Sequence, residues 1–176
     1  MQKDLGCCFT GYRPEKFGFE LSPENKSYND FTRKLYDNIV DLAETGVKTF
    51  YSGVAMGFDL IAAEAVVDVM RLRPELCIRL VACVPYIEQA KNYPPEWKDR
   101  YDTVLEECER VVLISDRYFK GCFHKRNRYM VDHSDFVVAY YSGAPGGTKN
   151  TVNYAESLGR TVINLYENTG EQMRLI

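Results

Sequence analysis

The chain has 176 residues, of which 45% are hydrophobic, 13% are aromatic and 27% are charged. This length and composition fit a single folded domain over residues 1–176, and they exclude a disordered or fibrous chain. No stretch reaches the roughly 20 apolar residues that a membrane span needs, and the first apolar run is too short for a secretory signal. We therefore expect a cytoplasmic protein without a membrane span.

The charges nearly balance, because 22 basic and 25 acidic residues give a net charge of −3. Proteins that bind duplex DNA usually carry a strong basic surplus. The balance argues against a nucleic-acid partner, although the basic patch at residues 124–129, with its flanking aromatic rings, leaves binding of a single strand open. The 13 tyrosines leave a homo-oligomer open as well.

Six cysteines are spread over the chain without a Cys-x-x-Cys pair, and most of them lie in apolar runs. In the absence of an export signal, this pattern indicates buried free thiols rather than disulfides. The cysteines do not have the spacing of a zinc site, nor do His124 and His133 pair with acids or cysteines. We expect no metal site.

Short apolar runs alternate with helical segments along the chain. The expected strands cover residues 5–9, 47–51, 76–84, 110–114, 136–141 and 161–165. The expected helices cover residues 28–45, 58–72, 94–108, 122–133 and 150–158. The polar stretch 13–27, which holds two prolines, indicates a loop or lid after the first strand.

The second to sixth expected strands are near-continuous apolar runs rather than alternating ones. Such strands are buried on both faces, which is typical of a parallel sheet between two layers of helices. The sequence therefore predicts an α/β fold, a Rossmann-like three-layer domain with a mostly parallel sheet.

Loops that contain glycine follow three of these strands, at Thr10-Gly11, at residues 52–59 and at Gly146-Gly147-Thr148. In a parallel sheet, ligands bind outside the carboxyl ends of the strands. Glycine lets backbone amides approach a phosphate closely, and the N-terminus of the following helix adds free donors and a favourable dipole. The alternative is a set of tight turns with a helix cap at Asp59. No complete Gly-x-Gly-x-x-Gly follows the first strand, so we assign no NAD dehydrogenase fingerprint and no cofactor.

A polar pair interrupts the helix expected over residues 122–133. Asn127 shares the core-facing side with Met130 and Val131, so we expect its amide to find buried partners or a ligand. Arg126 lies about 100° around the helix, where it would reach an anion from the edge of a pocket. The alternative is a structural role for Asn127 and a solvated charge on Arg126.

Three strings of the sequence, FTGYRPEKF, YSGVAMGFDLIAAEAV and KRNRYMVDHSDFVVAYYSGAPGGTKNTVNYAESLGR, resemble the YpsA-like family of small bacterial proteins. This family belongs to the SLOG superfamily, named for the DNA-processing protein Smf (DprA) and the LOG cytokinin-activating enzymes. The resemblance covers about residues 8–164. It implies a Rossmann-like fold and a pocket for a nucleotide-type small molecule, such as ADP-ribose, an NAD-like compound or a nucleoside phosphate, and it implies no particular reaction.

Carried onto this sequence, the resemblance implies a ligand-binding set drawn from four segments. Its members are Thr10, Gly11 and Arg13 in the first, Ser52, Gly53, Ala55, Gly57 and Asp59 in the second, Arg126 and Asn127 in the third, and Gly146, Gly147 and Thr148 in the last.

Three functions are compatible with these residues. We favour binding or sensing of a nucleotide-derived ligand, because this function needs no residue that the sequence lacks. Hydrolysis of a nucleotide N-glycosidic bond, as in the LOG enzymes, requires a placed carboxylate. The LOG pattern Pro-Gly-Gly-x-Gly-Thr-x-x-Glu is broken here, since Thr151 stands in place of the glutamate and the remaining acids are Asp59, Glu64 and Glu156. No catalytic residue is therefore assigned. The third function is binding of single-stranded nucleic acid, as in the DNA-processing relatives.

Overall fold

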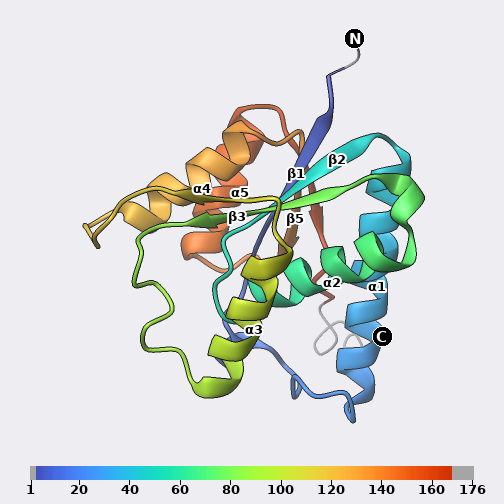
Figure 1. Cartoon of the computed structure of the whole chain (residues 1–176), viewed down its shortest axis with the longest axis horizontal. Coiled ribbons are helices and arrows are strands. Elements are labelled where there is room, and N and C mark those ends of the chain that lie inside the picture. The colour runs from blue at the N-terminus through green and yellow to red at the C-terminus, as the bar shows by residue number, and fades with distance from the viewer. Residues whose placement is uncertain (1–2, 168–176) are drawn as a thin grey trace, which may run out of the picture.

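The computed structural model describes residues 3–167. Within them a six-stranded sheet, whose neighbouring strands are all parallel, lies between two layers of helices (Figure 1). The strands are β1 (Leu5–Gly11), β2 (Val47–Ser52), β3 (Arg79–Val84), β4 (Arg110–Leu113), β5 (Phe136–Tyr140) and β6 (Thr161–Asn164). The helices are α1 (Lys26–Glu44), α2 (Phe58–Leu72), α3 (Pro95–Glu107), α4 (Cys122–Asp132) and α5 (Gly147–Ser157), with 3₁₀ turns at Pro14–Lys16 and Pro74–Leu76. The predicted Rossmann-like α/β fold is confirmed.

The sheet has the strand order β4-β3-β2-β1-β5-β6, so the direction of winding reverses at β1. The chain first adds β2, β3 and β4 on one side of β1 and then returns to add β5 and β6 on the other. Helices α1, α2 and α3 consequently contribute to one hydrophobic core, whereas α4 and α5 contribute to the core on the opposite face. The carboxyl ends of β1 and β5 therefore form the switch point at which sheets of this kind bind ligands.

Strand β1 is buried on both faces, which explains its unbroken apolar run. Cys7 and Phe9 belong to the core beneath α1, α2 and α3, and Cys8 belongs to the core beneath α4 and α5. All three side chains are fully buried, and Phe9 stacks on Phe50 of β2 with ring centroids 6.0 Å apart. Burial of such side chains is the main source of stability in a fold of this size.

The two outermost strands do not share this burial. Val111 and Leu113 of β4 are 47% and 42% exposed, and the ends of β6 are exposed too. The expectation that the second to sixth strands are all buried on both faces is therefore wrong for β4 and β6, because an edge strand has a neighbour on one side only. An apolar run does not reveal a strand's position in the sheet.

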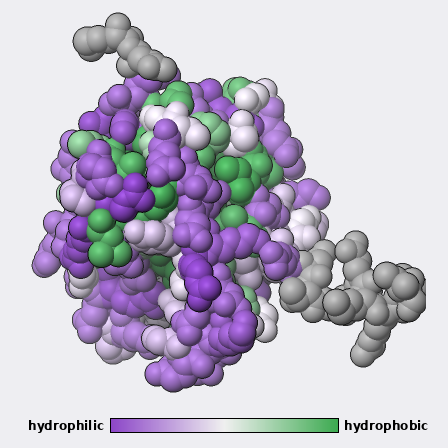
Figure 2. All heavy atoms as spheres, turned by 90° about the vertical axis from the view of Figure 1, so that its right-hand side faces the viewer, coloured by the Kyte–Doolittle hydropathy of each residue, from purple (hydrophilic) through white to green (hydrophobic). Residues whose placement is uncertain are grey.

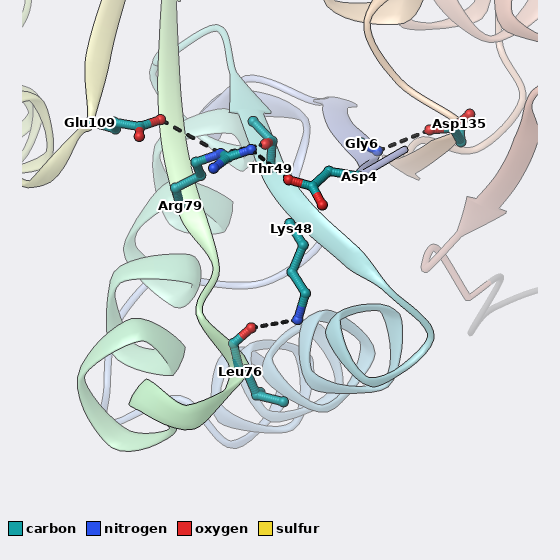
Figure 3. A network of polar contacts seen from close by, with 8 residues as sticks. All are labelled: Asp4, Gly6, Lys48, Thr49, Leu76, Arg79, Glu109 and Asp135. Atoms are coloured by element: carbon teal, nitrogen blue, oxygen red, sulfur yellow. Dashed lines mark hydrogen bonds and ion pairs between the residues drawn. The ribbon is translucent and has the colours of Figure 1, made fainter. Parts of the chain in front are cut away.

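A network of polar contacts ties the amino ends of the strands together (Figure 3). Arg79 donates from Nε to Thr49 Oγ1 over 2.8 Å and from Nη2 to Asp4 Oδ2 over 3.0 Å. Glu109 Oε2 forms an ion pair with Arg79 Nε at 3.6 Å. The backbone amide of Gly6 donates to Asp135 Oδ2 over 2.9 Å. These contacts lie at the edge of the sheet opposite to the switch point and link β1, β2 and β3 to the segments that precede β4 and β5.

The six cysteines of the chain all lie within residues 3–167. All six cysteines are free; four are buried, Cys108 is half-buried and Cys77 is exposed, so the expectation of buried thiols holds for most of them. In this part of the chain no His, Cys, Asp and Glu side chains cluster as they would around a metal ion, and no helix combines the length and apolar character of a membrane-crossing segment. The face seen in Figure 2 is mainly hydrophilic, with hydrophobic side chains in separate small groups.

Candidate ligand-binding site

A cavity of about 220 Å³ opens at the carboxyl edge of the sheet, at the switch point between β1 and β5. Four segments that are distant in the sequence meet there. Most of the residues singled out from the sequence line it, namely Thr10, Gly11, Arg13, Ala55, Asp59, Arg126, Asn127, Gly146, Gly147 and Thr148. Ser52, Gly53 and Gly57 do not line the cavity.

Helix α5 points its N-terminus at this cavity. The helix begins at Gly147, directly after Gly146, whose φ of 152° and ψ of −172° are accessible to glycine almost alone. The expected start at residue 150 was too late, because Asn150 already donates to Gly146 O within the first turn. The amides of Gly147 and Thr148 belong to the group that no helical carbonyl can satisfy, so they and the helix dipole are available to an anion.

Two buried charged residues, Arg126 and Asp59, form the floor of the site. Arg126 is 4% exposed, and its Nη1 donates to Gly53 O over 2.7 Å and to Cys83 O over 3.3 Å. Asp59 is 8% exposed. Burial raises the pKa of Asp59 to about 6, although the positive charges of Arg126 and Arg13 oppose the rise. Burial likewise lowers the pKa of Arg126, and the negative charge of Asp59 opposes this.

Gly53 allows these two charged groups to approach the end of β2. A Cβ atom at this position would press against Arg126 Nη1 and lie 2.9 Å from Asp59 Oδ2. Gln89, which is also buried, donates to the same Gly53 carbonyl over 3.1 Å. Gly53 is therefore a supporting residue of the floor rather than a lining residue.

Ser52 and Gly57 also support the site from behind. The Ser52 hydroxyl donates to Asp59 O over 2.8 Å and accepts from the Val54 amide over 3.1 Å, which fixes the loop before α2. Gly57 directly precedes α2, whose first amide, on Phe58, donates to Tyr12 O over 3.0 Å. These contacts hold the first and second loops against each other.

The expected roles of Arg126 and Asn127 are reversed in the structure. Arg126, expected at the edge, is buried, whereas Asn127, expected on the core side, is half-buried. Asn127 Oδ1 accepts a hydrogen bond from Arg126 Nε over 2.7 Å. The reading of Arg126 as a solvated charge is wrong, because carbonyl groups at the ends of β2 and β3 offset the cost of its burial.

Four lining residues escaped the sequence analysis: Tyr12, Lys16, Phe123 and Ala144. Lys16, like Arg13, is exposed and adds positive charge at the mouth. The Tyr12 hydroxyl lies 2.5 Å from Ser142 Oγ and ties the first loop to the last. Tyr12 and Lys16 stand within the string FTGYRPEKF, but no spacing rule distinguishes them from ordinary loop residues.

Of the three acids considered for hydrolysis, Asp59 alone lines the cavity. Glu64 instead forms two hydrogen bonds of 2.7 Å with Arg100 of α3. Glu156 is exposed near the end of α5. Thr151, which replaces the LOG glutamate, donates its hydroxyl to Gly147 O over 3.0 Å and is 5% exposed.

The parallel sheet, its switch point and the cavity there define a Rossmann-like protein with a candidate site at the carboxyl edge. The model of the YspA SLOG family (YpsA) matches residues 7–165, so the chain belongs to that family. It is 25% identical over 153 residues to a UPF0398 protein of Bacillus cereus, a match that covers 85% of this chain and 82% of the relative.

Two solved structures of DNA processing protein A share the fold. The protein from Helicobacter pylori aligns with a TM-score of 0.62 and 20% identity, covering 95% of this chain and 67% of that one. The protein from Streptococcus pneumoniae aligns with a TM-score of 0.62 and 17% identity, covering 96% of this chain and about half, 52%, of that one.

These neighbours correct one expectation. Net charge argued against a nucleic-acid partner, yet the structure of the Helicobacter pylori protein shows a single-stranded DNA binding mode. The fold of this chain is therefore shared with a protein that binds single-stranded DNA, and net charge alone does not exclude a nucleic-acid partner. The inference from charge failed because a net charge of −3 is a sum over the whole surface and does not report where positive charge gathers.

Proposed function

We propose that this protein binds a nucleotide-derived ligand by its phosphate in the cavity between β1 and β5. The observation that carries the proposal is the meeting of two anion-binding devices in one cavity: the N-terminus of α5, and the guanidinium groups of Arg126 and Arg13. Backbone donors of this kind hold a phosphate without reorganisation, and a guanidinium matches its geometry.

The size of the cavity limits what it holds. Ligand pockets commonly measure roughly 300–1,000 Å³, whereas this cavity measures about 220 Å³. The phosphate and its immediate neighbours therefore occupy the cavity, and the remainder of the ligand lies outside its mouth. ADP-ribose, an NAD-like compound and a nucleoside phosphate all meet this requirement.

The test is a thermal-shift and calorimetric titration with ADP-ribose, NAD and AMP. A Gly147→Asp variant places a carboxylate at the N-terminus of α5 and should abolish binding. Gly18→Asp is the matched control, because a Cβ at either glycine meets nothing within 4 Å and neither glycine has a positive φ. The proposal fails if none of the three compounds stabilises the protein, or if both variants bind as the unmodified protein does.

Single-stranded nucleic acid is a second candidate, favoured by the basic residues of α4. Lys125 and Arg128 are exposed on the helix that supplies Arg126 to the cavity. An affinity for a labelled oligothymidylate that weakens with salt and in Lys125→Ala would support it. An affinity that changes neither with salt nor in Lys125→Ala would count against specific binding of a single strand by these residues.

Hydrolysis of an N-glycosidic bond has weaker support, because Asp59 is the one acid among the described residues that lines the cavity. Release of free base from AMP that disappears in Asp59→Asn would establish this activity. Glu64→Gln is the control, since Glu64 is engaged with Arg100.

A further inference from the structure

Three aromatic rings stand beside the cavity and take no part in either hydrophobic core. Tyr86 follows β3, Tyr118 lies between β4 and α4, and Phe123 lies in the first turn of α4. The centroid of the Tyr86 ring lies 5.5 Å from that of Tyr118 and 6.0 Å from that of Phe123. Both contacts are edge-to-face, with interplanar angles of 80° and 86°. We call these three residues the aromatic ledge.

The ledge continues directly from the cavity. Phe123 lines the cavity, and the guanidinium carbon of Arg126 lies 5.7 Å from the centre of its ring. The two segments that carry Tyr86 and Tyr118, which follow β3 and β4, both run along the left of the molecule in Figure 1. A ligand anchored at Arg126 would therefore extend across Phe123 toward Tyr118.

The ledge is half-buried at Tyr86 and Phe123 and exposed at Tyr118, its outer end. Tyr118 is 63% exposed, and its chain neighbour Phe119 is 40% exposed. A single exposed apolar residue needs no explanation, but two adjacent exposed rings that continue from a cavity-lining aromatic residue indicate a binding surface.

The charges around the ledge indicate what it binds. Arg117, Lys120 and Lys125 are exposed on the segment that carries Tyr118 and Phe123. The acids on the same loops are Asp116 and Glu88, and Glu88 is paired with Lys91 over 3.2 Å. Aromatic faces surrounded by positive charge suit a partner that combines flat rings with phosphates.

We propose that the aromatic ledge stacks an unpaired nucleobase of the ligand whose phosphate lies in the cavity. This inference rests on the proposed function and adds to it a second subsite, specific for the base. The base belongs either to a free nucleotide or to a single-stranded nucleic acid, which present the same two chemical groups to the protein.

The experiment compares three probes on the full chain: inorganic pyrophosphate, ADP and a short fluorescein-labelled oligothymidylate. Tyr118→Ala removes one face of the ledge, and Tyr118→Trp keeps an aromatic face there. The exposure of Tyr118 makes both variants compatible with folding. A base–aromatic stack contributes enough that its loss weakens binding about fivefold to 150-fold.

We expect Tyr118→Ala to weaken the binding of a base-bearing probe by that factor and to leave pyrophosphate affinity unchanged. Tyr118→Trp should restore the affinity for the base-bearing probe. A loss for ADP identifies a free nucleotide as the source of the base, and a loss for oligothymidylate alone identifies a single strand. If ADP and oligothymidylate bind Tyr118→Ala as tightly as the unmodified protein, the ledge proposal is wrong. In that case pyrophosphate binding that is lost in Gly147→Asp would show that the cavity proposal stands. If neither pyrophosphate, ADP nor the oligothymidylate binds the unmodified protein, both proposals fail.

Discussion

The buried carboxyl group of Asp59 should make the stability of this protein depend on pH in a defined window. Its pKa rises from an ordinary value of 3.8 to about 6 in the folded state, mainly because burial penalises the charged form. Between these two values the folded protein holds a proton that the unfolded chain has released. The free energy of unfolding therefore falls as the pH rises through this window and levels off above it.

The difference between 3.8 and about 6 corresponds to roughly 3 kcal/mol. Asp59→Asn keeps the shape of the side chain and removes the titration. We expect the difference in unfolding free energy between the unmodified protein and Asp59→Asn to change by about this amount between about pH 4 and pH 7.

Urea unfolding of both proteins at a series of pH values measures this change. Other carboxyl groups titrate in the same range, but their contributions cancel in the difference between the two proteins. A difference that stays constant over the whole range would refute the reasoning, because it would mean that Asp59 titrates alike in the folded and unfolded chains.

Two further substitutions test the floor of the site and the opposite, amino edge of the sheet. Gly53→Ala should lower the unfolding free energy by about 1–3 kcal/mol, because its methyl group overlaps the Arg126 guanidinium. Gly18→Ala, with open space around the new Cβ, should be nearly neutral in the same urea titration. Arg79→Met should cost about 1 kcal/mol, mostly from the hydrogen bond to Thr49, because the arginine is 41% exposed and its ion pairs are screened. Ligand affinity, measured by calorimetry, should be unchanged in Arg79→Met, and a loss of affinity there would contradict the placement of the site.

The sequence predicted the layered fold because its main signals are local. The helix expected over residues 28–45 follows from the apolar spacing of Phe31, Leu35, Ile39 and Leu42, and these residues form the buried side of α1. Strand order is set by contacts between distant segments, so no local signal distinguished the central β1 from the edge strand β4. Both sequences are apolar, and only position in the sheet decides whether a strand is buried.

The sequence also predicted which loops meet at the cavity, since the carboxyl ends of parallel strands share one edge. It could not predict the role of each residue within those loops. Arg126 was misplaced because helical spacing assumes that charged side chains turn to solvent. In the structure the carbonyl groups of Gly53 and Cys83 accept from its guanidinium and allow it to be buried. Those acceptors lie at the carboxyl ends of β2 and β3, which are far from Arg126 in the sequence.

The acids available at the cavity support the proposed binding function more than a hydrolytic one. A hydrolase of glycosidic bonds needs a carboxylate that is free to act on water or on the sugar. Asp59 lies on the floor close to Arg126, and its backbone carbonyl accepts from the Ser52 hydroxyl, which holds the start of α2 against the end of β2. The position after the last glycine loop is filled by Thr151, whose hydroxyl is bonded within α5. The lining thus supplies several groups that stabilise an anion and one acid held on its floor, an arrangement suited to retaining a phosphate.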